Sequence, residues 1–60
     1  MLNLKELRKK QDITQKELAK KLGIERSKIS QWETGYCLPK VTELPKIAKA
    51  LNCNLSDFFD

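Results

Sequence analysis

The chain has 60 residues, of which 12 are Lys or Arg and 8 are Asp or Glu, so its formal net charge is +4; it has no His and two Cys. This length suffices for one small domain over residues 1–60 and excludes an enzyme with separate catalytic and substrate domains. No apolar run approaches the roughly 20 residues of a membrane span, and no charged-then-apolar signal sequence is present. We therefore expect a cytoplasmic protein that does not enter membranes and keeps both Cys reduced.

The positive charge is concentrated in the first half of the chain. Residues 1–30 hold nine Lys or Arg against four Asp or Glu, whereas residues 31–60 hold three against four, which gives net charges of +5 and −1. A basic half suits a polyanionic partner. The same charge is also typical of a lysine-rich solvated surface.

Apolar residues recur at helical spacing from the start of the chain. Leu2, Leu4 and Leu7 lie on one side of a first predicted helix that ends near Gln11. A second helix is predicted to begin at Thr14, because Glu17 follows it at the spacing of a capping box. Its buried face should consist of Leu18, Ala19 and Leu22.

Gly23 is expected to end this second helix. It can adopt a positive φ, and we expect the turn that follows to be too tight for a Cβ. A third helix is predicted over about 25–34, with Ile29 and Trp32 buried and Gly35 at its end. Its exposed face should present Arg26, Ser27, Lys28, Ser30 and Gln31.

Two further helices complete the pattern after a loop over 36–41. Thr42 can cap a fourth helix that runs to Leu51, with Pro45 in its first turn, where the missing N–H is tolerated. Asn54 can cap a short last helix. The residues expected to face inward on the fourth helix are Leu44, Ile47, Ala48 and Leu51. Because no window alternates like a strand, we predict an all-α, compact five-helix domain.

The second and third helices, joined at Gly23, have the pattern of a helix-turn-helix over about 14–34. The residues of this motif and its frame are Thr14-Gln15-x-Glu17-Leu18-Ala19, Gly23, Ile29-Ser30-Gln31-Trp32-Glu33, Gly35, Pro39, Leu44, Ile47-Ala48-x-Ala50-Leu51 and Asn54-Leu55-x-x-Phe58. In these residues, and over nearly its whole length, the chain resembles the Cro and lambda-repressor-like (XRE-type) helix-turn-helix DNA-binding family. It departs from that family at Tyr36-Cys37-Leu38, where basic residues are frequent.

The resemblance implies a lambda-repressor-like domain that binds double-stranded DNA with its third helix in the major groove. Arg26 suits guanine and Gln31 suits adenine through paired hydrogen bonds, whereas Lys28 suits a base or a phosphate. The expected base contacts are Arg26, Ser27, Lys28, Ser30 and Gln31. The expected phosphate contacts are Thr14, Gln15, Tyr36 and Lys40. The alternative for the third helix is a solvated face with no partner.

The resemblance also implies an ion pair between Arg8 in the first helix and Glu33 at the end of the third. Two adjacent aromatic residues cannot both face inward on one helix. We therefore expect Phe58 and Phe59 to divide between the core and a surface, and we take Leu55, Phe58 and Phe59 as candidate dimer contacts.

The residues that enzymes need are missing from the chain. There is no nucleophile with a base at catalytic spacing, no glycine-rich phosphate loop and no acidic cluster, so we expect no enzyme, no cofactor and no metal site. Cys37 and Cys53 lack partners of zinc-site type, and redox sensing at Cys37 stays open as an alternative.

Two functions are left by these exclusions. The first is a sequence-specific transcriptional regulator, a repressor acting as a homodimer on a pseudo-palindromic operator. The second is an antitoxin-like or adaptor module that uses the same fold to bind a protein partner.

Overall fold

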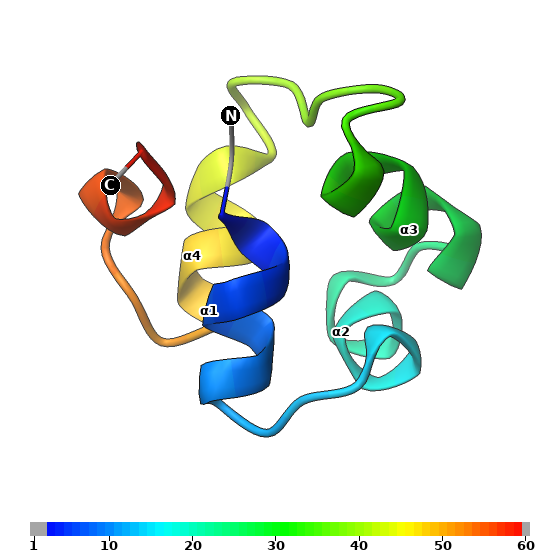
Figure 1. Ribbon diagram of the computed structural model, residues 1–60, viewed down its shortest axis with the longest axis horizontal. Coiled ribbons are helices and arrows are strands. Elements are labelled where there is room, and N and C mark those ends of the chain that lie inside the picture. The colour runs from blue at the N-terminus through cyan, green and yellow to red at the C-terminus, as the bar shows by residue number, and fades with distance from the viewer. Residues whose placement is uncertain (1–2, 60) are drawn as a thin grey trace.

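A computed structural model describes residues 3–59, which form four α-helices, a terminal 3₁₀ helix and no strand (Figure 1). The elements are α1 (Leu4–Lys10), α2 (Gln15–Leu22), α3 (Arg26–Thr34), α4 (Leu44–Ala50) and η1 (Leu55–Phe59). The predicted all-helical class is confirmed. The fifth element is a 3₁₀ helix of five residues, so a count of five α-helices is not confirmed. Leu2, assigned to the first helix from its spacing, lies outside the described residues.

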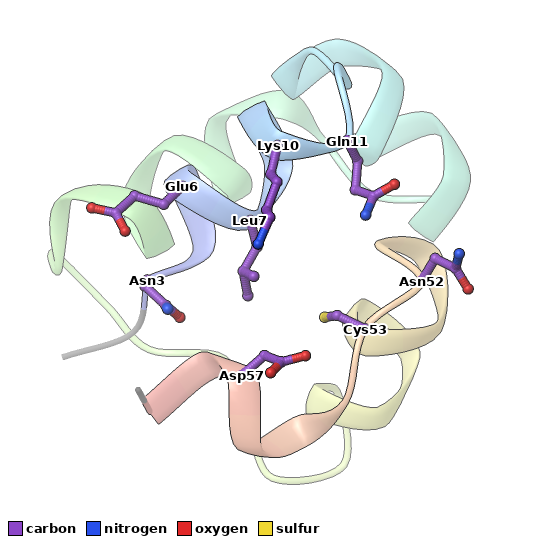
Figure 2. A pocket seen from close by; sticks show the side chains of 8 residues that line it. All are labelled: Asn3, Glu6, Leu7, Lys10, Gln11, Asn52, Cys53 and Asp57. Atoms are coloured by element: carbon purple, nitrogen blue, oxygen red, sulfur yellow. The ribbon is translucent and has the colours of Figure 1, made fainter.

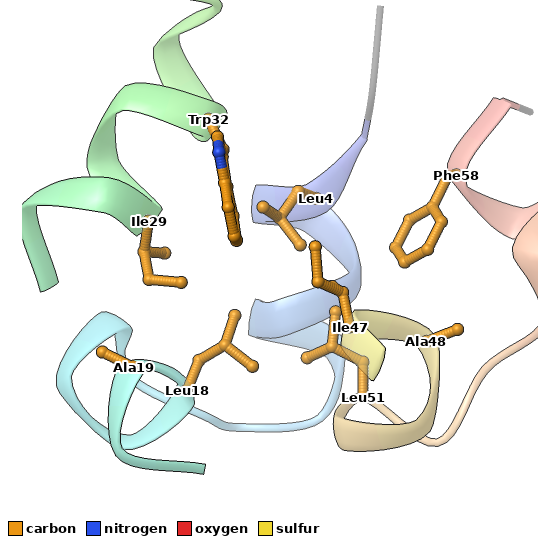
Figure 3. Close-up of a cluster of buried hydrophobic side chains, with 9 residues drawn as sticks. All are labelled: Leu4, Leu18, Ala19, Ile29, Trp32, Ile47, Ala48, Leu51 and Phe58. Carbon is orange, nitrogen blue, oxygen red and sulfur yellow. The ribbon is translucent and has the colours of Figure 1, made fainter. Parts of the chain in front are cut away.

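The core joins all five elements. In Figure 1, α2 and α3 lie on one side of α1 and η1 lies on the other. Trp32 and Ile29 enter the core from α3, and Phe58 enters it from η1 (Figure 3). The buried apolar residues are Leu4, Leu18, Ala19, Ile29, Trp32, Ile47, Ala48, Leu51 and Phe58. Leu22 and Leu44, also expected to face inward, are partly buried against this cluster. Within the described residues, no helix is long and apolar enough to cross a membrane.

The start of α2 is fixed by the predicted capping box. The Glu17 backbone N–H donates to Thr14 Oγ1 at 3.0 Å, and the Thr14 backbone N–H donates to Glu17 Oε1 at 2.9 Å. These bonds satisfy two amide donors at a helix end that would otherwise lack partners. The hydrogen bond from the Thr14 backbone N–H is the main cause that holds the pKa of the Glu17 carboxyl below its usual 4.5, and the Thr14 side chain is the next.

Gly23 ends α2 in the left-handed conformation, with φ of 69° and ψ of 33°. The expectation that the turn is too tight for a Cβ is wrong, because a Cβ built on Gly23 meets no atom within 4 Å. Glycine is needed here for its backbone angles, which other residues adopt at a cost. Gly35 ends α3 in the same region, with φ of 82°.

The start of α4 differs from the prediction. Thr42 does not cap the helix: the N-cap residue is Glu43, and no side-chain cap bond is present. The chain instead forms a turn in which the Lys40 N–H donates to Glu43 Oε1 at 2.9 Å and the Glu43 N–H donates to the Lys40 carbonyl at 2.8 Å. This turn delays the helix, and Pro45 still falls in its first turn as predicted.

The start of η1 also differs in its hydrogen bonds. The Asn54 backbone N–H donates to Asp57 Oδ2 at 3.0 Å, so the carboxylate of Asp57 holds this turn where the Asn54 side chain was expected to cap it. In η1, Phe58 is 1% exposed and Phe59 is 64% exposed. The two aromatics therefore divide between core and surface as expected, and Phe58 is not available as a surface contact.

We predict that Gly23→Ala destabilises the fold by about 1–2 kcal/mol, because alanine pays the cost of a left-handed backbone but meets no neighbour. Gly23→Asn should lose less stability, since asparagine adopts the left-handed backbone conformation more readily. Urea denaturation of the two variants and the original protein measures both effects. A loss well above 2 kcal/mol in both variants would show that space, and not φ, is limiting.

Candidate nucleic-acid interface

The residues expected to contact DNA bases lie on the outer side of α3. Arg26, Ser27 and Lys28, in its first turn, are exposed as predicted. Ser30 and Gln31, in the next turn, are half-buried, so the prediction that they are exposed is wrong. The exposed members of the five base-contact candidates therefore all lie in the first turn of α3.

The residues expected to contact phosphates lie on both sides of this helix. Thr14 and Gln15 are at the N-terminus of α2, where Thr14 is exposed and Gln15 is half-buried. Tyr36, which is 80% exposed, and Lys40, also exposed, belong to the loop after α3. The fold thus places these candidates at two separate points of the chain that both adjoin α3.

Arg8 and Glu33 form an ion pair between α1 and α3. Arg8 Nε donates to Glu33 Oε2 at 2.6 Å and Arg8 Nη2 donates to Glu33 Oε1 at 3.3 Å. Arg8 Nη1 also donates to the Ile13 carbonyl at 2.8 Å, in the segment between α1 and α2. The two side chains are 10% and 3% exposed. One guanidinium therefore joins α1, the α1–α2 connection and the last turn of α3.

Gln15 extends this pair to the surface. Its Nε2 donates to Glu33 Oε1 at 2.9 Å, and its Oε1 accepts a hydrogen bond from Arg26 Nη1 at 3.2 Å. Because a carboxylate can only accept, Glu33 fixes which end of the Gln15 amide faces inward. We call Arg8, Glu33, Gln15 and Arg26 the polar chain. It runs from the buried side of α1 to the exposed start of α3.

Only part of the polar chain could be predicted from the sequence. The family resemblance implied the contact between Arg8 and Glu33, and it assigned Gln15 and Arg26 to DNA separately. No spacing rule connects Gln15 with Glu33, which is 18 residues away. The one available signal for this contact was that a polar residue, Gln15, stands at the first position of a helix. That position is equally typical of a side chain exposed to solvent.

The polar chain keeps Glu33 ionised. Burial by itself raises the pKa of the Glu33 carboxyl, but the hydrogen bonds from Arg8 and Gln15, with the charges of Arg8 and Lys5, outweigh it and lower the pKa below its usual 4.5. At neutral pH the carboxylate therefore accepts hydrogen bonds from both Arg8 and Gln15.

The far end of α3 is also held from outside the helix. The Gln31 carbonyl accepts a hydrogen bond from the Cys37 backbone N–H at 3.3 Å and one from Thr34 Oγ1 at 3.3 Å. The Gln31 side-chain oxygen Oε1 accepts a hydrogen bond from Cys37 Sγ at 3.5 Å. Base-contact candidates at both ends of α3, Arg26 and Gln31, are thus bonded to residues of other segments.

A cavity of about 360 Å³ lies away from this surface (Figure 2). It contains no residue of α2 or α3, and its lining is Asn3, Glu6, Leu7, Lys10, Gln11, Asn52, Cys53 and Asp57. Burial, and then the charge of Asp57, raises the pKa of the Cys53 thiol. Within the described part of the chain, no group of three His, Cys, Asp or Glu could hold a metal ion.

Comparison with known proteins adds an independent line of evidence. A family model described as helix-turn-helix matches residues 4–58. Two relatives from Archaeoglobus fulgidus, both described as uncharacterized HTH-type transcriptional regulators, are each 39% identical over 56 residues. Each match covers 93% of this chain, and the two cover 80% and 79% of the relatives. The matched segment runs from the first residue of α1 into η1.

We predict that the protein loses stability as the pH falls below 4.5, the usual pKa of a glutamate. Since folding lowers the pKa of Glu33, the stabilisation is complete above that value and is lost as the pH falls through the folded pKa. Glu33→Gln should lose roughly 3 kcal/mol at neutral pH, because it leaves Arg8 without its counter-charge. Its remaining stability should depend less on pH between 5 and 3, in contrast to the original protein.

Urea denaturation as a function of pH measures this difference. Glu6→Gln is the matched control, because it removes an exposed carboxylate from α1 and should keep the acid dependence of the original protein. If the stability of Glu33→Gln fell with decreasing pH as steeply as that of the original protein, the role given to Glu33 would be contradicted.

Proposed function

The chain belongs to the XRE-type helix-turn-helix family of DNA-binding transcriptional regulators, and we propose that it represses transcription as a homodimer on a pseudo-palindromic operator. Repression requires only that the promoter be occupied. In each protomer α3 enters the major groove, which is wide enough to admit a helix. The half-sites lie about one helical turn, roughly 34 Å, apart.

The observation that most supports this proposal is the way Arg26 is held. It stands exposed at the start of α3, and its Nη1 is hydrogen-bonded to Gln15 at 3.2 Å. Gln15 is in turn bonded to the buried Glu33. A guanidinium has five N–H donors, so this bond leaves others for the O6 and N7 acceptors of guanine. Holding Arg26 before binding lowers the entropy lost when it meets a base.

The remaining contacts follow from position. Ser27 and Lys28 reach base edges beside Arg26, and Ser30 and Gln31 reach them from the next turn of α3. Thr14 and Gln15 bind one phosphate at the N-terminus of α2, where unpaired backbone N–H groups favour an anion. Tyr36 and Lys40 bind the flanking phosphates from the loop. These phosphate contacts set the register of α3, and the base contacts set the sequence.

We propose that the dimer contact lies at η1. Leu55 and Phe59 are 44% and 64% exposed, so each leaves apolar surface on this short helix. Burying that surface against a second copy is favourable, and on DNA the neighbouring half-site supplies a high local concentration of the second copy. Weak association in solution is therefore enough for tight binding to a two-site operator.

We predict that Arg26→Ala weakens binding to the preferred site by about 1–3 kcal/mol and removes the preference at one base pair. Selection from random DNA, followed by titration of the selected site, measures both effects. Lys46→Ala on α4 removes the same charge and should leave the selected motif unchanged. No enriched motif with the original protein would overturn sequence-specific repression, and an unchanged motif with Arg26→Ala would overturn the role of Arg26.

We predict that Phe59→Ala weakens binding to a two-site operator about tenfold, because it removes an aromatic contact worth more than 1 kcal/mol. Binding to a single half-site should not change. Gel-shift titration on the two DNAs, with sedimentation of the protein alone, tests this. Equal loss on both DNAs would contradict the dimer contact, and an unchanged DNA affinity together with lost binding to a different protein would favour the adaptor module.

A further inference from the structure

The chain folds back on the last part of α3 and brings Cys37 against Gln31. Gly35 makes the reversal in the left-handed conformation, with φ of 82°. The Cys37 N–H then donates to the Gln31 carbonyl at 3.3 Å, and its thiol donates to Gln31 Oε1 at 3.5 Å. Cys37 therefore binds both the backbone and the side chain of the same residue.

The position of Cys37 is set by the fold. Its side chain is half-buried and packs against the hydrophobic core. The thiol therefore has little freedom to leave Gln31, whereas a side chain of an exposed loop would sample many positions. A distance of 3.5 Å is ordinary for a hydrogen bond to or from sulfur, and the thiol is a weak donor.

The Cys37 thiol lies against the oxygen end of the Gln31 amide. The oxygen faces the thiol, so the amino group Nε2 is turned away from it. We propose that Cys37 is a positioning residue for DNA recognition, which orients the Gln31 carboxamide so that Gln31 meets the base pair as a hydrogen-bond donor. This inference rests on the proposed function, in which α3 lies in the major groove.

The preferred base follows from that orientation. The paired hydrogen bonds between glutamine and adenine, expected from the sequence, require the amide oxygen to accept from the base and the amino group to donate. Here Oε1 is turned toward the Cys37 thiol, and the amino group Nε2 is the end left to meet a base. Gln31 should therefore select a purine by its N7 acceptor, with guanine favoured because its O6 is a second acceptor.

Arg26 provides a parallel at the other end of α3. Its guanidinium is bonded to Gln15, a residue outside the helix, and Gln31 is bonded to Cys37 in the same way. Cys53 provides the contrast. It is also a half-buried free thiol, but it lines the cavity between α1, η1 and the segment after α4, which includes no residue of α3.

The test compares base discrimination among four variants. The site selected from random DNA is changed at each base pair in turn, and affinities are measured for the original protein and for Gln31→Ala, Cys37→Ala, Cys37→Ser and Cys53→Ala. Gln31→Ala identifies the base pair that Gln31 reads. Cys37→Ala should reduce discrimination at that pair by about two- to five-fold and leave the other pairs unchanged. Cys53→Ala should match the original protein.

Cys37→Ser and one double variant separate positioning from a structural role. Cys37→Ser keeps an O–H donor at the same position and should recover part of the lost discrimination. The double variant Cys37→Ala/Gln31→Ala should discriminate no worse than Gln31→Ala alone, because the two residues act through one contact. Urea denaturation of each variant reports any change in stability separately.

The inference is overturned if Cys37→Ala weakens all sites equally, changes a different base pair, or leaves discrimination intact. It is also overturned, with the proposed function still standing, if Gln31→Ala changes no base pair while Arg26→Ala does. If the original protein selects no motif at all, the proposed function and this inference fall together.

Discussion

The arrangement of the first three helices depends on one ion pair held almost entirely out of water. Arg8 and Glu33 are 10% and 3% exposed, and moving two such charges from water costs several kcal/mol each. Their mutual attraction offsets that cost only with good geometry and further hydrogen bonds. Here the Ile13 carbonyl and the Gln15 amide supply those bonds. The pair and these bonds thus join α1, the segment before α2, Gln15 of α2 and the last turn of α3.

The same pair reaches the surface through Gln15. A buried carboxylate orients an amide, and the amide orients the guanidinium of Arg26. A long side chain on an exposed helix face normally loses much rotational freedom on binding. In the structure, Arg26 is held by a hydrogen bond from its Nη1 to Gln15 Oε1. A few hydrogen bonds thus connect the buried side of α1 with the exposed start of α3.

Local rules predicted the elements whose signals are local. Thr14 and Glu17 are three residues apart, so their capping box could be read directly, and Gly23 could be identified as the end of α2. The same rules failed where two local hydrogen-bonding patterns compete. At the start of α4 the reciprocal turn between Lys40 and Glu43 replaced a Thr42 cap. Gly23 was predicted for two reasons, of which its positive φ is confirmed and the lack of space for a Cβ is wrong.

In the candidate site, too, some features were predicted from the sequence and others were not. From helical periodicity and the family resemblance, the chain's residues alone established an all-helical domain, the helix-turn-helix, the polar face of α3 and the partners in the ion pair. Which of Phe58 and Phe59 enters the core, the half-burial of Gln31 and the bonds of Gln15 and Cys37 came only from the packed molecule. The reason is physical: periodicity reports which face of a helix is apolar, whereas the partner of a polar side chain depends on how distant segments meet.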